Sequence, residues 1–281
     1  MSELTPVEIR SVQRAVEREL TRAQDRYHGQ RTPKAILLAG QPGAGKTMLT
    51  SMILPMLGND AALINGDDYR RYHPDYKTLY KEYGPEAVPM TSAFSAAVTE
   101  NLIERFSELR YNMVIEGTGR SVEVPKKTAE LLNLKGYTVE MSVIATRPVL
   151  SLISTVQRFY QMNERGTIPR ATAVEAHDNV VSLLPGNLDV LVRLAAISKI
   201  AIWTREAELI YDSESDQRQP SNALRKIWKK KWTAAEITET KAQIANLQIL
   251  EGQYNLGQQI AIDEIQKRFR HEMSRSREQS R

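Results

Sequence analysis

Eight residues of this chain, GQPGAGKT at 40–47, combine three glycines with a lysine and a threonine at a spacing that can bind phosphate. They match the pattern G-x-x-x-x-G-K-[S/T], in which the glycines let backbone N–H groups turn toward a phosphate. The Lys46 ammonium can then reach the β- and γ-phosphates of a nucleotide, and the Thr47 hydroxyl can ligate Mg²⁺. An apolar run before the motif and a helical pattern after it give the context that the pattern requires. We therefore predict a nucleotide-binding loop formed by Gly40, Gln41, Pro42, Gly43, Ala44, Gly45, Lys46 and Thr47.

Two adjacent acids, Asp67 and Asp68, directly follow the apolar run AALIN, and two arginines come next. Ligands of parallel sheets bind outside the carboxyl ends of the strands, so these acids should lie on the ligand-binding rim. We expect this strand to end next to the phosphate-binding loop. A carboxylate there can take the proton of an acceptor hydroxyl, and we assign this role to Asp67. The alternatives are that Asp67 caps a helix or pairs with Arg70, and Asp68 is the better candidate for the cap.

A third acid, Glu116, ends the apolar run YNMVIEG and is followed by the residues TGR. An acid at this place can hold Mg²⁺ through water, together with Thr47. Many motor ATPases carry a second acid at the next position to polarise the attacking water, but here that position is Gly117. The guanine-specificity pattern N-K-x-D is also missing. Both absences favour transfer to a small acceptor over nucleotide hydrolysis, and Arg120 follows the rim where an anionic diphosphate would lie.

Three arginines, Arg158, Arg165 and Arg170, lie in the stretch STVQRFYQMNERGTIPRAT. This stretch predicts a helix that runs into a loop containing glycine and proline, and a basic loop of this kind resembles a lid over the nucleotide. Arginine can stabilise the charge on a travelling phosphoryl group. The alternative is a solvated arginine on an exposed face, which carries most weight for Arg165.

Short apolar runs alternate with amphipathic patterns along most of the chain, and this order positions the residues above. The alternation predicts an α/β fold with a mainly parallel sheet flanked by helices, as in P-loop NTPases and kinases. We expect strands at 34–40, 61–65, 111–117, 137–146, 199–204 and 207–213. We expect helices at 5–27, 46–57, 89–110, 124–136, 148–162, 172–185 and 186–198.

The patterns divide the chain into four parts. The polar stretch SESDQRQPSN separates the alternating region from a final helical region that is rich in lysine and arginine. The predicted parts are an N-terminal helix at 1–32, a P-loop domain at 33–212, a linker at 213–221 and a basic helical extension at 222–281.

Composition excludes several classes of protein. The chain of 281 residues has no cysteine, which excludes disulfides and thiolate chemistry, and its four histidines are too scattered to form a zinc site. No apolar run is long enough to span a membrane, and the charged N-terminus does not resemble a secretory signal, so we expect a cytoplasmic protein. The net charge of +4 gathers toward the C-terminus. Such a basic tail can bind nucleic acid, but a solvated helix face is the better interpretation.

Taken together, several ordered motifs resemble the zeta-toxin family, kinases of bacterial toxin–antitoxin modules. The resemblance covers roughly residues 33–212. It rests on the blocks GQPGAGKT, INGDDYRRYHPDY, EYGPEAV, VIEGTGRSVEVPKKTAELL, VIATRPVLSLISTVQRF and PRATAVEAHD.

The resemblance implies ATP- and Mg²⁺-dependent phosphorylation of a UDP-activated amino sugar, typically at the 3′-hydroxyl of UDP-N-acetylglucosamine. The product would block early peptidoglycan synthesis, and a small helical antitoxin would restrain the enzyme. By position, the resemblance implies that Lys46 binds the ATP phosphates, that Asp67 is the base and that Arg158 and Arg170 clamp phosphate. The remaining metal and substrate surroundings would be formed by Glu100, Glu116, Thr118, Arg120 and Thr128.

Two other functions remain open from the sequence. One is a kinase for an unrelated small metabolite. The other is a nucleotide-dependent binding module that uses residues 222–281 on nucleic acid, which would give weak turnover and salt-sensitive binding.

Overall fold

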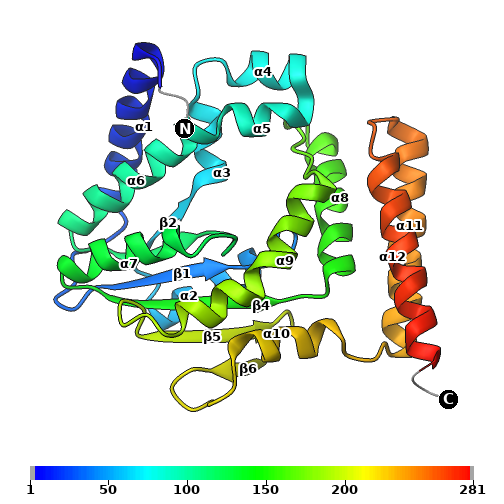
Figure 1. The fold of residues 1–281 in the computed structure, drawn as a ribbon. Coiled ribbons are helices and arrows are strands. Elements are labelled where there is room, and N and C mark those ends of the chain that lie inside the picture. Colours follow the sequence, from blue (N-terminus) through cyan, green and yellow to red (C-terminus); the bar gives the residue numbers. More distant parts are fainter. Residues whose placement is uncertain (1–3, 279–281) are drawn as a thin grey trace.

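A six-stranded sheet forms the centre of the computed structural model, which describes residues 4–278 (Figure 1). The order in the sheet is β2-β3-β1-β4-β5-β6; the pairs among the first five are parallel, and β6 is antiparallel to β5. This confirms the predicted α/β fold with a mainly parallel sheet. The strands are β1 Lys34–Ala39, β2 Ala61–Asn65, β3 Asn112–Glu116, β4 Thr138–Ala145, β5 Lys199–Thr204 and β6 Leu209–Asp212.

Helices connect the strands and cover both faces of the sheet (Figure 1). Before β4 they are α1 Pro6–Gln24, α2 Lys46–Met56, α3 Gly66–Tyr69, α4 Tyr76–Tyr83, α5 Ala87–Met90, α6 Ser92–Glu108 and α7 Glu123–Leu134, with short 3₁₀ turns at Arg70–Tyr72 and Gly84–Glu86. After β4 they are α8 Pro148–Glu164, α9 Val174–Leu191, α10 Pro220–Trp228, α11 Ala234–Tyr254 and α12 Gln259–Glu278.

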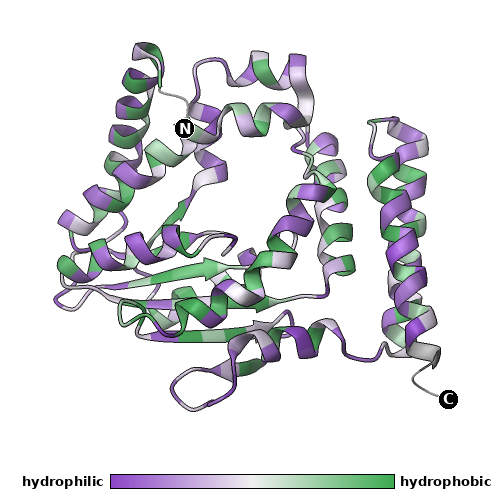
Figure 2. Cartoon of the chain, viewed as in Figure 1, coloured by the Kyte–Doolittle hydropathy of each residue, from purple (hydrophilic) through white to green (hydrophobic). Residues whose placement is uncertain are grey.

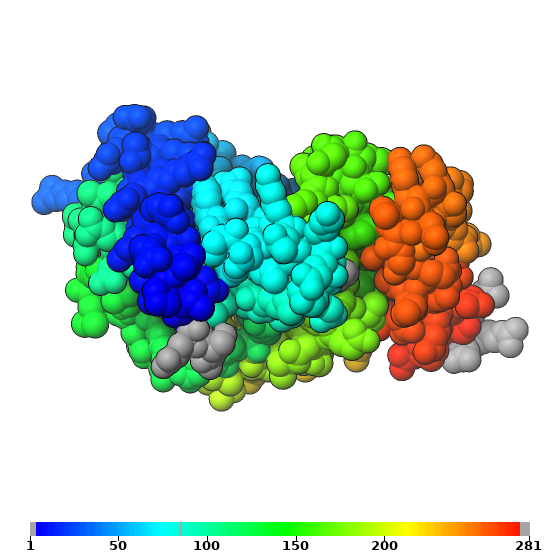
Figure 3. Space-filling view, turned by 90° about the horizontal axis from the view of Figure 1, so that it is seen from above, coloured from blue at the N-terminus to red at the C-terminus, as the bar shows by residue number. Residues whose placement is uncertain are grey.

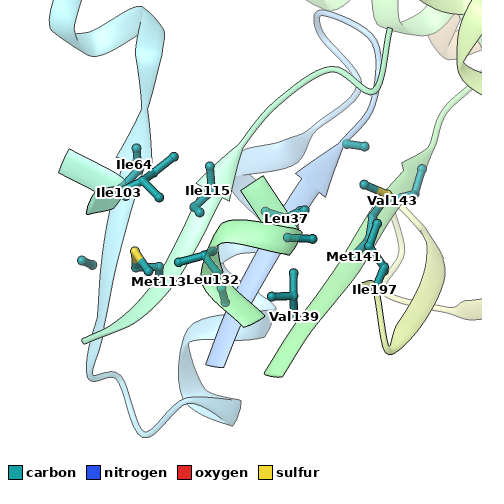
Figure 4. Close-up of a cluster of buried hydrophobic side chains, with 14 of the residues drawn as sticks. Leu37, Ile64, Ile103, Met113, Ile115, Leu132, Val139, Met141, Val143 and Ile197 are labelled. Carbon is teal, nitrogen blue, oxygen red and sulfur yellow. The ribbon is translucent and has the colours of Figure 1, made fainter. Parts of the chain in front are cut away.

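The core explains why the strands have continuous apolar sequences. Every residue of β1 after Lys34 is buried, because helices cover both faces of a parallel sheet. Ile36 and Leu38 face α2, whereas Leu37 faces a larger cluster that includes α6 and α7. Figure 4 shows Leu132 of α7 among the strand side chains of this larger cluster. The same strands are hydrophobic along most of their length in Figure 2. Burying each such side chain contributes about 1.5–3 kcal/mol.

The position of β3 corrects one expectation. β3 lies between β1 and β2, so β2 does not end next to the phosphate-binding loop as predicted. The register places Glu116 opposite Leu38 on one side and Asn65 on the other. Consequently Glu116 is the acid nearest the loop in the sheet order, and the acids after β2 approach the site from one strand further away.

Two sequence boundaries also differ from the structure. The predicted helices at 172–185 and 186–198 are largely one helix, α9, which continues through Pro185. α10 begins at Pro220, within the predicted linker, and its residues Ala223 and Leu224 are buried in the same cluster as the sheet. Pro185 and the polar run at 213–221 both predict a break in helical structure. Tertiary packing overrides these local signals.

The helix α1 begins with a capping box, in which Thr5 and Glu8 satisfy each other's backbone N–H groups. It packs on α6 and bonds the segment after α3, since Tyr72 donates to Glu19 and the His73 ring contacts Glu8 at 2.9 Å. α1 therefore supports the segment that follows Asp67.

The C-terminal hairpin, α11 with α12, forms a second core with α8 (Figure 1). Seen from above in Figure 3, this hairpin and α1 lie at opposite ends of the molecule. The turn of the hairpin is held by buried Glu251, which accepts from the backbone N–H groups of Gly257 and Gln258 and from the hydroxyl of Tyr160 on α8.

Candidate active site

The glycine-rich loop after β1 is shaped for a phosphate. Gly45 caps α2 with a φ of 106°, and Gly43 has a φ of 74°; L side chains rarely adopt either conformation. A Cβ on Gly43 would also clash with the backbone oxygen of Ser151 on α8. Lys46 opens α2 and donates to the carbonyl oxygen of Gly40 at 3.0 Å. The loop thus joins a helix N-terminus to a lysine, the arrangement that binds phosphate.

Lys46 and Glu116 form an ion pair, with 3.6 Å between the ammonium nitrogen and a carboxylate oxygen. Burial lowers the pKa of Lys46, and the attraction of Glu116 opposes this while Arg158 adds to it. Burial also raises the pKa of Glu116, against the attraction of Lys46 and with the repulsion of Asp67. Each member of the pair is thus less stable as an ion than it would be in water. A triphosphate or a cation bound here would compensate for that cost.

Asp67 lies in α3, directly after β2, and its side chain is 54% exposed. Partial burial opposes its ionisation, but the hydrogen bond and charge of Arg70 and the charges of Arg170 and Arg158 outweigh it, so the pKa of Asp67 lies below its ordinary value. The Arg70 guanidinium donates to the carboxylate at 2.9 Å. Asp67 therefore does pair with Arg70, and the pair leaves the carboxylate ionised and partly exposed.

The cap of α3 is not the residue predicted. Asn65 is the N-cap and accepts from the backbone N–H of Asp67 at 3.0 Å, so the assignment of Asp68 as the cap is wrong. The helix begins one turn earlier than the acids suggest, because the amide of Asn65 already meets the free N–H groups. The same amide donates to Glu116 at 3.1 Å and so connects the end of β2 to the end of β3.

The three predicted arginines are placed differently. Arg170 donates to the carbonyl oxygen of Asp67 at 2.6 Å, which joins the loop after α8 to α3. The charge of Arg158, exposed on α8, acts on Lys46, Asp67 and Glu116 together. Arg165 is the C-cap that follows α8 and is exposed, as the alternative for it expected.

Among the other predicted substrate residues, Thr118 contacts the phosphate-binding loop and Arg120 contacts Thr118. The carbonyl oxygen of Thr118 accepts from Gly40 at 3.3 Å, which places Thr118 beside the loop. Arg120 is exposed, and its N–H lies 3.4 Å from the Thr118 hydroxyl. Glu100 is exposed on α6. The Thr128 hydroxyl donates to Val124 within its own helix, so in this structure it is already satisfied.

A cavity of about 270 Å³ opens between α2 and the ends of β2 and β3. Its lining includes the hydroxyl-bearing Thr47 and the acids Glu116 and Asp68, which supply the oxygen donors that Mg²⁺ prefers. Within residues 4–278 no group of three or more histidines or acids forms a complete metal cage. The residues present therefore fit a magnesium ion that takes its remaining ligands from phosphate and water.

Two residues of the site were missed in the sequence. Arg205, directly after β5, donates to the backbone oxygens of Gly43 and Ala44 and so holds the loop from behind. Its place after an apolar strand, at the same rim, was a usable signal. Tyr80 on α4 is buried, its hydroxyl has no partner among the described atoms, and burial raises its pKa, with smaller effects from the charges of Arg70, Arg170 and Asp67. Only the packing of α4 reveals it.

The fold and this loop define a phosphate-loop protein of the α/β class. The chain belongs to the Zeta toxin family, whose family model matches residues 17–216. The resemblance noted in the sequence is thus confirmed. Within residues 4–278 there is also no helix long and apolar enough to cross a membrane.

Two curated relatives cover most of the chain. Toxin PezT of Streptococcus pneumoniae serotype 4 is 39% identical over 222 residues, which are 78% of this chain and 86% of PezT. Toxin zeta of Streptococcus pyogenes is 37% identical over 221 residues, 78% of this chain and 77% of the toxin.

Solved structures agree on the fold. A structure from the PezAT chromosomal toxin–antitoxin system of Streptococcus pneumoniae matches with a TM-score of 0.76 and 33% identity, over 89% of this chain and 99% of that one. The AvrRxo1-ORF1:AvrRxo1-ORF2 complex with sulphate ions matches with a TM-score of 0.57 at 12% identity, over 87% and 85% of the two chains. This second likeness concerns the fold alone.

Proposed function

We propose that this protein transfers the γ-phosphoryl group of ATP to a hydroxyl of a UDP-activated amino sugar, typically the 3′-hydroxyl of UDP-N-acetylglucosamine. The observation that carries the proposal is the exposed, ionised carboxylate of Asp67, which shares one electrostatic environment with Lys46 and Arg158. A base beside a cluster of cations suits the transfer of a phosphoryl group to an alcohol. Membership of the Zeta toxin family supports the same class of reaction.

In the proposed step, Asp67 takes the proton of the acceptor hydroxyl. The acceptor oxygen forms a bond to the γ-phosphorus, the bond from that phosphorus to the β-phosphate oxygen breaks, and ADP leaves with the electron pair. Lys46 holds the phosphates, and Arg158 and Arg170 stabilise the charge on the group in transit. No water is needed, which agrees with Gly117 at the position where many motor ATPases carry a second acid.

The remaining predicted residues complete the proposed site. Thr47 and Glu116 would hold Mg²⁺, which when bound neutralises the charge of the nucleotide phosphates. Thr118 and Arg120 follow β3 on the same rim as the loop and would contact the acceptor diphosphate and sugar. Glu100 and Thr128 would contact the acceptor from α6 and α7.

We also propose the biological setting. The S. pneumoniae relative is described within a toxin–antitoxin system. By that likeness this chain would act as a cytoplasmic toxin whose product blocks peptidoglycan synthesis, and a small helical antitoxin would restrain it.

The test is to incubate the protein with ATP, Mg²⁺ and a panel of UDP-sugars and to identify the products by mass and NMR. We expect ADP to form only with a suitable sugar. Asp67→Asn should lower this turnover by about 10²–10⁴-fold with little change in ATP affinity, because the variant loses a general base and not a phosphate ligand.

The matched control is Asp75→Asn, the same chemical change at an exposed position of the same segment. Near-full sugar-dependent turnover by Asp67→Asn would remove Asp67 as the base. ADP formation that ignores every sugar would instead indicate a hydrolase or a kinase for another metabolite.

A further inference from the structure

A chain of side-chain hydrogen bonds runs from the C-terminal hairpin to the phosphate-binding loop. On α12, Arg268 donates two bonds of 2.6 Å to the carboxylate of Asp178 on α9. The ring of His177 lies 3.1 Å from Asp178 through Nδ1 and 2.8 Å from the Ser151 hydroxyl through Nε2. Ser151 Oγ accepts from the side-chain amide of Gln41 at 3.2 Å. Gln41 is the second residue of the loop.

The pKa of His177 and the partners of its ring indicate where the protons of this chain lie. Burial lowers the pKa of His177, against the attraction of Asp178, so the ring is neutral and carries one proton. Nδ1 faces only a carboxylate, which accepts, so the proton lies on Nδ1. Nε2 then accepts from the Ser151 hydroxyl; if that hydroxyl turned to Pro148 O, 2.9 Å away, Nε2 would be buried without a partner. Every donor therefore points toward Asp178.

At the other end, the chain fixes how Gln41 is turned. Gln41 is fully buried, its Nε2 also donates to Thr146 O at 2.7 Å, and its Oε1 has no partner among the described atoms. Turning the amide over would place Oε1 against Thr146 O and Ser151 Oγ, once that hydroxyl points to His177. The backbone oxygen of Gln41 accepts from Ala44 N at 3.0 Å, so the position of Gln41 shapes the turn that presents the loop amides.

The three residues Ser151, His177 and Asp178 have the order of donors and acceptors found in hydrolases, but Ser151 and His177 are both fully buried. No substrate can reach that hydroxyl, which excludes a nucleophile. The hairpin is also anchored elsewhere: Tyr160 of α8 donates to Glu251, and Arg147 lies 4.0 Å from the carboxylate of Glu272 on α12. Holding the hairpin in place therefore does not by itself require Arg268.

We propose that Arg268, Asp178, His177 and Ser151 are positioning residues for the phosphate-binding loop, so that the C-terminal hairpin sets the affinity for nucleotide. The two bonds from Arg268 fix the carboxylate, which fixes the imidazole, the hydroxyl and finally the amide of Gln41. Without Arg268 the loop populates other arrangements, and its apparent affinity falls by the fraction that remains competent. The proposal rests on nucleotide binding at the loop and is independent of the acceptor.

The experiment compares Arg268→Gln, Arg268→Lys and the matched control Tyr160→Phe, which loosens the same hairpin at its other anchor. ATP affinity is measured by calorimetry, and folding by circular dichroism and urea unfolding. Arg268→Gln should weaken ATP binding about tenfold, the worth of one charge-assisted hydrogen bond. Arg268→Lys should recover part of this loss, and Tyr160→Phe should stay within about twofold. In turnover, KM for ATP should rise while kcat changes little.

A double-mutant cycle tests the path itself. If the chain transmits the effect, Arg268→Gln and Ser151→Ala should be strongly non-additive in ATP affinity, because either change breaks the same chain. Additive losses, or equal losses in Arg268→Gln and Tyr160→Phe, would overturn the proposal. If Arg268→Gln fails to fold, Asp178→Asn replaces it, because the asparagine can still contact both Arg268 and His177. Its ATP affinity is then compared with that of Tyr160→Phe in the same way.

A second measurement separates this proposal from the proposed function. Hydrogen exchange of the loop amides of residue 41 and residues 43–46 in nucleotide-free protein should speed up in Arg268→Gln and not in Tyr160→Phe. If the wild-type protein bound no ATP, the proposed function would fail, yet this exchange difference would still support the positioning role. Equal exchange in the two variants would remove it.

Discussion

At the scale of single residues, the two acids of the site differ in what surrounds them. Partial burial opposes the ionisation of Asp67, but the charges of three arginines outweigh it and lower its pKa, whereas burial, together with two other acids, raises the pKa of Glu116 against the attraction of Lys46. A carboxyl group that accepts a proton has to be ionised at neutral pH before the reaction. A carboxyl group that ligates a metal can be stabilised in its ionised form by the cation when the cation binds. The charges thus separate the proposed roles of two residues of similar chemistry.

The buried ring of His177 gives a prediction for stability against pH. It is neutral in the fold, and its pKa lies below the ordinary value of 6.5 because of burial. As the pH falls through 6.5 the unfolded chain takes up a proton that the folded chain refuses, so the free energy of unfolding should fall on the acid side. One proton contributes at most about 1.4 kcal/mol per pH unit.

Urea unfolding between about pH 7.5 and pH 5.5 measures this slope, a range in which histidine is the main side chain to titrate. His177→Gln should be less stable at the upper pH but should lose less on acidification than the wild type. Parallel curves for the two proteins would show that His177 does not cause the slope.

At the scale of elements, the phosphate-binding loop depends on how closely α8 approaches it. Gly43 lies against the backbone of Ser151. A Cβ added at Gly43 would be 2.9 Å from Thr155 Cγ2. Arg205, which directly follows β5 at the same edge of the sheet, also holds the loop by bonding two of its carbonyl oxygens. Its shape is therefore set by two elements that come much later in the chain.

Gly43→Ala should lower ATP affinity by more than about a hundredfold, because the loop or α8 must move to admit the methyl group. Gly58→Ala is the matched control: its φ of 67° is similarly strained, but no atom lies within 4 Å of the added Cβ. Both variants should lose about 1 kcal/mol of stability from backbone strain. Only Gly43→Ala should lose nucleotide binding in calorimetry, and equal affinities would show that the contact with α8 is not limiting.

At the scale of the whole molecule, the buried side chains fall into a main core on one face of the sheet, a smaller core between the sheet and α2, and a hairpin core of α8 with α11 and α12. α1 and α10 belong to the main core although both lie outside the predicted P-loop domain. The division of the chain at residues 213–221 stays a prediction. What the packing shows is that α8 is shared, since it touches the loop on one side and the hairpin on the other.

The separation of the hairpin core from the cores that contain the sheet predicts two levels of protection in native-state hydrogen exchange. Amides of β1 and β4 should exchange only on global unfolding. Amides of α12 should exchange through a local opening whose free energy is lower than that of global unfolding by at least about 2 kcal/mol. The comparison is made by exchange in low concentrations of urea. Equal opening free energies for β1 and α12 would mean that the hairpin unfolds together with the sheet.

Taken by itself, the sequence determined the elements that local pattern controls. β2 and β5 have the predicted bounds, and the loop at 40–47 follows β1 as its glycines and lysine required. Period and turn chemistry are short-range properties, so residues close in sequence carry the whole signal. The family followed from several such blocks in order.

The tertiary structure decided what depends on residues far apart. The strand order places β3 beside β1 and so brings Glu116 to Lys46. The residues next to Lys46 and Glu116 in the sequence do not predict this pair. The link from Arg268 to Gln41 crosses α12, α9 and α8 before it reaches the loop. Burial and hydrogen-bond direction exist only once those elements meet, because the charge state and orientation of a side chain are set by its neighbours in space.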